Sequence, residues 1–555
     1  MKAARADGTG RSGEWQKLLL GAAAAYVLLG LVAAASLAPR VPYADAWRHY
    51  ARLLTQPFPA SVLAVDNGHP EIFANLVRLA DLRWFAGSEY LQIALALALV
   101  LATFIVLLRV LRTPPMDPTA RAASALALAL SLFWLVNERA LAHANDGLHV
   151  YCVLLLLGAM IAALAREERA LTPLRVACAA LLCCAAALNF GSGIASFVAL
   201  GALLFLRRAA AWAYAIAGLA LLLTCALYWM LKSGQSLPLA FKPTDQFVFG
   251  LSQLAAPVQY LFWPFVDPLA AAQVPAPLGA FALACARAWQ SLFGDVHTSV
   301  LPQSLCGAAL AAVLVLITLH ARRVSNEAMR LGLALAWFGV GVSGVIALSR
   351  ADYFAQYPTQ LYAPRYLPWS TVAWSGLLIA LIGMTSTRRA AIAISLAVAL
   401  FAAPAEFGMI RIMQHQREVA DDVALAAVVG VWPDRGSPGE VDPGDTRAGA
   451  DAMRSSHTGP FAWPEAALVG KSIPSDARPL MPIEFKTVAV RNDFNTDAQR
   501  IEATLSVLAC VRMRLLVADE THVVGLLREV GPQYWRGAAL AANGVPLRIL
   551  EPHCD

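Results

Sequence analysis

Residues 91–111 read LQIALALALVLATFIVLLRVL, an apolar run long enough to cross a lipid bilayer as a helix. The whole chain of 555 residues is 59% hydrophobic and only 14% charged, whereas soluble domains carry about 25% charged residues. We therefore expect an α-helical polytopic membrane protein with about eleven transmembrane helices. The other expected spans are residues 17–38, 121–137, 148–165, 174–190, 192–206, 211–231, 300–320, 329–348, 366–385 and 390–410.

Basic residues predict how these spans are oriented. Every second loop is basic, as the positive-inside rule requires of cytoplasmic loops. The N-terminus is therefore expected in the cytoplasm and, after an odd number of spans, the C-terminus in the periplasm of a bacterial inner (plasma) membrane. The first span is expected to be an uncleaved anchor, because its apolar run is long for a signal peptide. The basic residues of the N-terminal segment and of these alternate loops are Lys2, Arg5, Arg11, Lys17, Arg109, Arg112, Arg121, Arg166, Arg169, Arg175, Arg207, Arg208, Arg322, Arg323, Arg330, Arg388 and Arg389.

The composition divides the chain into residues 1–410, a transmembrane domain, and residues 411–555, a small soluble α+β domain. Within the transmembrane domain, long outer loops are expected at 39–90, with two interfacial amphipathic helices, and at 232–299. In the soluble domain, 433–482 is expected to be largely loop, 415–429 and 497–509 helical, and 486–490 and 512–517 strands. Cys510 and Cys554 lie in this domain, where a periplasmic disulfide and two free thiols are both compatible with the sequence.

The first candidate for chemistry is Asp45, in the stretch Tyr43-Ala44-Asp45-Ala46-Trp47 just after the first apolar run. A carboxylate beside aromatic side chains and desolvating lipid can have a raised pKa and act as a general base. Asp is also a favoured helix N-cap, and a helix is expected to begin at Trp47. Both interpretations fit the spacing.

A second polar group opens the next amphipathic helix of the same loop. Asp66, Asn67, His69 and Glu71 lie within six residues, where they could orient a sugar or serve in a turn and a helix cap. No second half-site at ligand spacing accompanies them, so a divalent metal is not supported and no cofactor is expected.

Two further groups lie at the expected outer ends of spans. His143, Asn145, Asp146 and His149 occupy the short turn between the third and fourth spans, as a cavity wall or as a solvated turn. Arg365 follows a proline where the tenth span begins. There it could bind a phosphate at the level of the lipid headgroups or simply extend its charge to the membrane surface.

The stretch Pro364-Arg365-Tyr366-Leu367-Pro368 resembles the Pro-Arg-Tyr-Leu-Leu-Pro stretch of GT-C membrane glycosyltransferases of the protein O-mannosyltransferase and aminoarabinose transferase type. The stretch Asp45-Ala46-Trp47, followed by Asp66-Asn67-Gly68-His69-Pro70-Glu71, is similar to a pattern of uncharacterised bacterial relatives. In that pattern an Asp-x-Trp precedes Asn-Glu-His-Arg-Ile.

The resemblance implies the transfer of a sugar from a polyprenyl-phosphate donor in the membrane to a hydroxyl of a glycan, lipid or protein acceptor on the periplasmic face. Asp45 would be the general base of an inverting reaction, and Arg365 with Tyr366 would bind the departing phosphate. The expected lining of the substrate cavity is Trp47, Asp66, Asn67, His69, Glu71, Asp146 and His149.

Two other classes of function compete with this interpretation. A lipid or solute transporter should carry ionisable residues near the bilayer midplane, and the apolar runs are almost free of them. A non-catalytic membrane protein of envelope glycan assembly needs no second acid, and here Ala46 follows Asp45 where many family members have Glu. Nucleic-acid binding is not expected, because no basic cluster is interleaved with aromatic residues.

Overall fold

The computed structural model describes residues 7–112, 116–166, 170–231, 241–384, 386–432, 442–492, 495–505 and 514–552. The chain divides into two compact units. The first unit consists of Met1–Ser36, Ala64–Phe73 and Ala94–Ile412, and the second of Leu37–Leu63, Ala74–Ile93 and Met413–Asp555. Most of the expected first outer loop is therefore grouped with the C-terminal residues rather than with the helical bundle.

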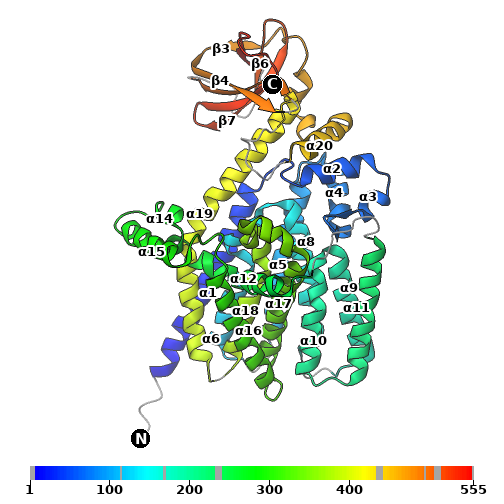
Figure 1. Ribbon diagram of the computed structural model, residues 1–555, viewed down its shortest axis with the longest axis vertical. Coiled ribbons are helices and arrows are strands. Elements are labelled where there is room, and N and C mark those ends of the chain that lie inside the picture. Colours follow the sequence, from blue (N-terminus) through cyan, green and yellow to red (C-terminus); the bar gives the residue numbers. More distant parts are fainter. Residues whose placement is uncertain are drawn as a thin grey trace. The chain divides into compact units, whose positions relative to one another are not determined.

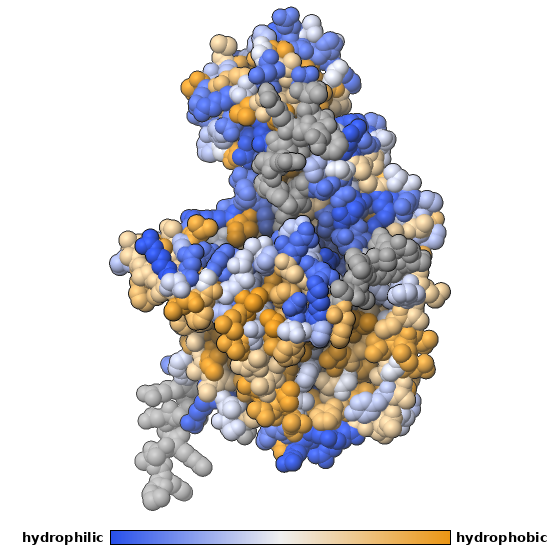
Figure 2. Space-filling view, in the orientation of Figure 1, coloured by the Kyte–Doolittle hydropathy of each residue, from blue (hydrophilic) through white to orange (hydrophobic). Residues whose placement is uncertain are grey.

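The first unit is built of helices that run side by side (Figure 1). In the described part of the chain, nine helices are long and apolar enough to cross a membrane, and the apolar helices Pro173–Asn189 and Gly191–Leu206 are shorter. In the view of Figure 2, hydrophobic side chains cover much of the flank of these helices. These features confirm the prediction of a polytopic helical protein. The helices that contain the long apolar segments are α1 (Asp7–Leu37), α5 (Tyr90–Leu111), α6 (Pro118–Phe133), α8 (Ala144–Leu164), α11 (Ala211–Leu231), α16 (Leu301–Ala321), α17 (Glu327–Gln356), α18 (Leu367–Gly383) and α19 (Arg388–Val429), and the shorter ones are α9 (Pro173–Asn189) and α10 (Ser196–Leu206).

Helices α17 and α18 pack with almost no side chain between them. A Cβ atom added to Gly332 would lie 2.4 Å from the carbonyl oxygen of Gly376, and one added to Gly376 would lie 2.5 Å from that of Gly332. Small residues at such crossings let helix backbones approach closely, which gives dispersion contacts that lipid cannot replace. This contact fixes the helix that begins just after Arg365.

The expected second outer loop includes a helix of the bundle. Helix α12 (Pro243–Leu261) packs against α16, α17 and α18. Its Leu254 belongs to a buried apolar cluster with Leu310 and Leu333. After α12 come α13 (Trp263–Val266), α14 (Pro268–Ala271) and α15 (Leu278–Phe293). The short elements around the candidate site are β1 (Val65–Asp66), β2 (His69–Pro70), η1 (Leu135–Asn137), α7 (Glu138–Ala142), η2 (Gly191–Ala195), η3 (Pro358–Tyr362) and η4 (Pro364–Tyr366).

The second unit contains an antiparallel sheet of seven strands in the order β3-β9-β6-β7-β8-β5-β4 (Figure 1). The strands are β3 (Arg478–Leu480), β4 (Pro482–Asn492), β5 (Asn495–Leu505), β6 (Leu515–Ala518), β7 (Val523–Gly531), β8 (Tyr534–Ala539) and β9 (Arg548–Glu551). Its helical elements are α2 (Ala46–Thr55), α3 (Ala60–Leu63), most of α4 (Ile72–Phe85), the end of α19, α20 (Pro443–Ser456), η5 (Gly459–Ala462) and η6 (Pro464–Leu468).

Two predictions for the C-terminal residues are wrong. Residues 497–505 form part of strand β5 rather than a helix, because Ile501, Ala503 and Leu505 alternate with less buried residues and enter the core of the sheet. Of the 433–482 segment, residues 433–441 lie outside the described residues, and 442–482 is not largely loop, since it contains α20, η5, η6 and β3. Asp442 caps α20 by accepting a hydrogen bond from the backbone N–H of Asp445. Residues 415–429 are helical and 486–490 lie in a strand, as predicted.

Candidate functional site

The polar stretch 66–71 forms a β-hairpin in the first unit. Asp66 pairs with His69, and the two residues between them, Asn67 and Gly68, have φ angles of +47° and +81°. Positive φ at both central positions is typical of a type I′ turn, for which Asn-Gly is the favoured sequence. Of the expected cavity residues, Asp66 and Glu71 are buried here, and His69 is half-buried.

The hairpin presents His69 to an aromatic cluster around Phe190. The His69 ring lies 4.6 Å from the Phe190 ring between centroids, and His149 stacks on Phe190 at 4.0 Å and 10°. Trp369, in the first turn of α18, is 6.3 Å from Phe190. Tyr228 from α11 donates a hydrogen bond of 2.5 Å to the carbonyl of Gly68. The structure therefore joins two of the predicted histidines, His69 and His149, through the ring of Phe190.

Close approach explains the glycines beside Phe190. A Cβ atom on Gly191 would lie 2.4 Å from the Nδ1 atom of His69, and one on Gly193 would lie 2.1 Å from the carbonyl oxygen of Ala186. Both positions have ordinary φ angles. The turn between α9 and α10 thus needs glycine because there is no space for a side chain, not because the backbone is left-handed.

Most residues between the third and fourth expected spans are buried, and their charged side chains are paired. Arg139 of α7 forms an ion pair with Asp146 of α8, and the Nε2 atom of His149 lies 4.0 Å from the Oδ1 atom of Asp146. His143 is 5% exposed and lies 3.8 Å from Glu138. The interpretation of this segment as a solvated turn is wrong, because neighbouring charges compensate one another inside the bundle. Asn145 lies in the first turn of α8.

Arg365 has a different environment. It lies in the 3₁₀ turn Pro364–Tyr366, which directly precedes α18. Its guanidinium donates to Oε1 of Gln360 at 2.8 Å and to the hydroxyl of Tyr353 at 3.5 Å, and it lies 5.1 Å from the Tyr366 ring centroid. Among the described residues, it makes no ion pair with a carboxylate. The buried Tyr366 hydroxyl makes no hydrogen bond of good geometry within the described ranges.

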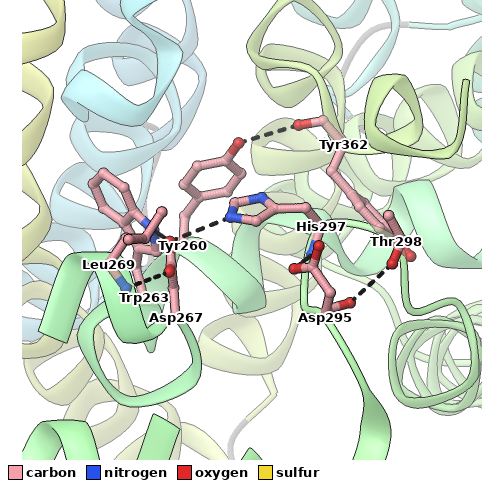
Figure 3. A network of polar contacts seen from close by, with 8 residues as sticks. All are labelled: Tyr260, Trp263, Asp267, Leu269, Asp295, His297, Thr298 and Tyr362. Atoms are coloured by element: carbon pink, nitrogen blue, oxygen red, sulfur yellow. Dashed lines mark hydrogen bonds and ion pairs between the residues drawn. The ribbon is translucent and has the colours of Figure 1, made fainter. Parts of the chain in front are cut away.

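A histidine–aspartate pair in the segment after α12 was missed by sequence reasoning. The Nε2 atom of His297 lies 3.2 Å from Oδ2 of Asp267, which also accepts from the indole of Trp263 at 2.8 Å (Figure 3). The hydrogen bond to Asp267 raises the pKa of His297. Burial alone would raise the pKa of Asp267, but the hydrogen bonds from His297 and Trp263 outweigh it and lower that pKa. Thirty residues separate the two in sequence, so spacing offered no signal.

Asp45 and Trp47 belong to the second unit. Asp45 is the residue before α2 but makes no side-chain cap; instead its carboxylate lies 3.1 Å from Arg48. Arg48 also pairs with Asp445 at 2.5 Å. Trp47 is fully buried, and a Cβ atom on Gly449 of α20 would lie 2.5 Å from its carbonyl oxygen. Trp47 therefore packs α2 against α20.

A buried hydrogen-bond network joins α2 to the start of α5 in the same unit. The hydroxyl of Tyr50 donates to Glu89 at 2.6 Å and accepts from Gln92 at 2.6 Å, while Asp81 accepts from the backbone N–H of Glu89. Burial raises the pKa of Glu89 to about 8, and its φ of +65° is rare for a residue with a side chain. A buried acid held in this conformation rigidifies the link between the two helices.

The first unit thus contains Asp66, Asn67, His69, Glu71, Asp146, His149, Arg365 and Tyr366 of the predicted set, and the second contains Asp45 and Trp47. Within the described residues, no group of three or more His, Cys, Asp or Glu side chains is arranged to hold a metal ion. The predicted pair Cys510 and Cys554 lies outside the described residues.

Comparison of the chain with protein-family models, with curated proteins and with solved structures gives no match.

Proposed function

We propose that the protein is a membrane glycosyltransferase that transfers a sugar from a polyprenyl-phosphate donor to an acceptor hydroxyl. The observation that carries this proposal is the Arg365 guanidinium, which has neutral hydrogen-bond partners and no carboxylate partner among the described residues. The proposal includes the orientation argued from the basic loops, with about eleven spans and the C-terminal residues in the periplasm.

An arginine in this environment favours an anionic ligand. A part-buried charge at the end of a helical bundle is unfavourable unless a counter-charge accompanies it. The bond to Gln360 and the ring of Tyr366 hold the guanidinium plane, so its fork of N–H donors is preorganised for two phosphate oxygens. The Tyr366 hydroxyl can supply a further hydrogen bond to the same phosphate.

Helix α12 offers groups for the sugar itself. Both side-chain polar atoms of Gln253 and of Gln259 are buried without a hydrogen-bond partner in the described ranges. The Ser370 hydroxyl donates to the carbonyl of Gln253, and the Tyr260 hydroxyl donates to that of Tyr362. These bonds place α12 alongside the segment that carries Arg365. Unpaired buried amides are unfavourable in a membrane bundle, and sugar hydroxyls would satisfy them.

The chemistry requires few groups. The acceptor hydroxyl attacks the anomeric carbon as the bond to the lipid phosphate breaks, with inversion, and the hydroxyl proton passes to a base. Negative charge grows on the departing phosphate, and a fixed guanidinium stabilises that charge more in the transition state than in the bound donor. No nucleotide takes part.

The test is to purify the full-length protein and identify the isoprenoid phosphates that accompany it by mass spectrometry. We expect wild type to retain an isoprenoid phosphate and Arg365→Ala to lose at least about 90% of it, since a charge-assisted bidentate contact contributes roughly 1.5–3 kcal/mol. Arg365→Lys should retain an intermediate amount, because it keeps the charge but not the fork. Arg323→Ala is the matched control, since this exposed arginine lies just after α16 and makes no described side-chain ion pair.

Equal lipid phosphate in wild type and Arg365→Ala would overturn the role of this arginine. Absence of isoprenoid phosphate from both would contradict the proposed donor and favour the assembly or transport alternatives.

A further inference from the structure

A cavity of about 490 Å³ lies within the second unit, away from the residues used above. Its walls come from the segment before α2, the turn between α4 and α5, the end of α19, the η5 region and the β-sheet. A volume of this size is within the range of small-molecule sites, roughly 300–1,000 Å³.

Arginines dominate the charged lining of this cavity. Arg40, Arg417, Arg514 and Arg528 line it, together with two carboxylates, Asp421 and Glu529. Bringing four guanidinium groups to one cavity is electrostatically unfavourable unless anions offset their repulsion. Two of the arginines form ion pairs with carboxylates that do not line the cavity. The Nη2 atom of Arg528 lies 2.6 Å from Asp422, and Arg514 lies 3.5 Å from Glu465.

Aromatic rings orient two of these guanidinium groups. The Cζ atom of Arg514 lies 3.4 Å from the centroid of the Trp463 ring, and that of Arg40 lies 4.5 Å from the centroid of the Tyr90 ring. Stacking fixes the plane of a guanidinium, and arginine binds an oxyanion with two parallel hydrogen bonds. The cavity therefore has preorganised donors for a phosphate.

Asp421 adds a different kind of group. It lines the cavity within the field of Arg528, Arg417 and Arg514, but makes no hydrogen bond or close ion pair with a residue of the described ranges. A carboxylate without such a partner accepts hydrogen bonds from hydroxyl groups. Arginines that donate to an oxyanion lie beside a carboxylate that accepts from hydroxyl groups. A ligand with both an oxyanion and hydroxyl groups matches this lining, and the volume leaves room for a sugar ring.

We propose that this cavity binds a phosphorylated sugar, with the phosphate on the arginines and the sugar hydroxyls on Asp421. The phosphorylated sugar could be soluble or could be the head of a lipid-linked one, since the cavity chemistry is the same. The proposal does not depend on glycosyl transfer, because its residues are separate from Arg365 and the α12 amides.

Isothermal titration calorimetry on the full-length protein in detergent tests the proposal, with glucose 1-phosphate, glucose and inorganic phosphate as probes. We expect glucose 1-phosphate to bind at least about tenfold more tightly than either glucose or phosphate alone. Affinity should fall as salt rises, because ions screen the arginine contacts. Competition by a short-chain polyprenyl-phosphate sugar, but not by the polyprenol, would identify the lipid-linked source; its absence would identify the soluble one.

Arg417→Gln and Arg40→Gln should each weaken glucose 1-phosphate binding by about ten- to a hundredfold, the effect of losing one charge-assisted contact. Asp421→Asn should weaken glucose 1-phosphate binding but leave phosphate binding unchanged. The matched control is Arg478→Gln, an exposed arginine of β3 outside the cavity, which should bind like wild type. An unchanged unfolding temperature shows that a variant is folded. If Arg417→Gln or Arg40→Gln does not fold, the glucose 1-phosphate affinity of the other variant is enough for the comparison.

Three results would overturn the proposal: no binding of glucose 1-phosphate to wild type, equal affinity for glucose or phosphate alone, or equal loss in Arg478→Gln. Retention of isoprenoid phosphate in the earlier test would be unaffected by any of them, so the two proposals fail separately.

Discussion

The two residues to which the resemblance assigned the chemistry, Arg365 and Asp45, lie in contrasting surroundings. Arg365 in the first unit is held by a glutamine and a tyrosine, so its charge is still available to a ligand. Asp45 in the second unit lies 3.1 Å from Arg48, with nearly half of its side chain exposed. A charge with neutral partners points to a ligand, whereas a charge with an opposite neighbour is explained by the protein alone. The comparison therefore strengthens Arg365 as a candidate more than Asp45.

The largest expected effect concerns Asp45, the weaker of the two candidates. If Asp45 is the general base, Asp45→Asn should lower sugar transfer by about 10²–10⁴-fold. The unfolding temperature should hardly change, because an exposed ion pair contributes at most about 1 kcal/mol. The measurement is the rate at which the co-purified donor releases polyprenyl phosphate when acceptor is added.

Asp445→Asn is the matched control for Asp45→Asn. It removes the other carboxylate that pairs with Arg48 and leaves Asp45 in place, so transfer should continue at nearly the wild-type rate. Wild-type transfer by Asp45→Asn would show that Asp45 serves only to pair with Arg48, and the base would have to be sought elsewhere.

A smaller effect is expected when the loss of stability on replacing Arg528 is compared with the loss on replacing Arg365. Arg528 donates to Asp422 at 2.7 Å and to the carbonyl of Glu418 at 2.9 Å. Removing it leaves part-buried acceptors unpaired, so Arg528→Ala should lower the free energy of unfolding of the second unit by about 1–3 kcal/mol. Arg365→Ala, which frees only neutral partners, should change stability by less than about 0.5 kcal/mol.

Thermal unfolding followed by tryptophan fluorescence measures both variants, since Trp369 is buried in the first unit and Trp535 in the second. Equal destabilisation by the two substitutions would mean that Arg365 has a structural role, contrary to the contrast drawn above.

The smallest effect concerns His297 and its dependence on pH. Its pKa is raised above the ordinary value of 6.5 by Asp267, so the folded state binds the proton more tightly than the unfolded chain. The stabilisation is therefore complete below pH 6.5 and is lost as pH rises through the folded-state pKa. We expect a small fall in unfolding temperature across that interval, which Asp267→Asn should abolish. A wild-type unfolding temperature that is constant across that interval would disprove the pairing.

Much of the helical part could be predicted from the sequence because long apolar runs admit few structures in a membrane. The runs at 91–111 and 211–231 became α5 and α11 almost residue for residue. For residues 66–71 the sequence offered a turn as one of two interpretations, and the structure has a hairpin turn at Asn67 and Gly68. The prediction failed where tertiary contacts decide: residues 497–505 are rich in the helix formers Ala, Gln, Arg, Glu and Leu, yet they became a strand by pairing with β4 and β8.

The candidate site was predictable only as single residues. The sequence pointed to Arg365 because it follows a proline where the tenth expected span begins and lies in the stretch that resembles GT-C glycosyltransferases. It gave no sign that Phe190 joins His69 to His149, or that Asp267 faces His297, since these partners come from distant segments. Nor could composition show that the arginines of the cavity converge, because they lie at positions between 40 and 528.

The contact between Gly332 and Gly376 limits how this protein can change over generations. Even alanine at either position would place a methyl group within 2.5 Å of a backbone oxygen, so α17 and α18 would have to separate before the variant could be tolerated. The residues of the proposed site can be exchanged one at a time, because none of them separates two helix backbones. The two glycines cannot be exchanged in this way. They have no chemistry of their own, so selection on them acts through the position of α18 and of Arg365 just before it.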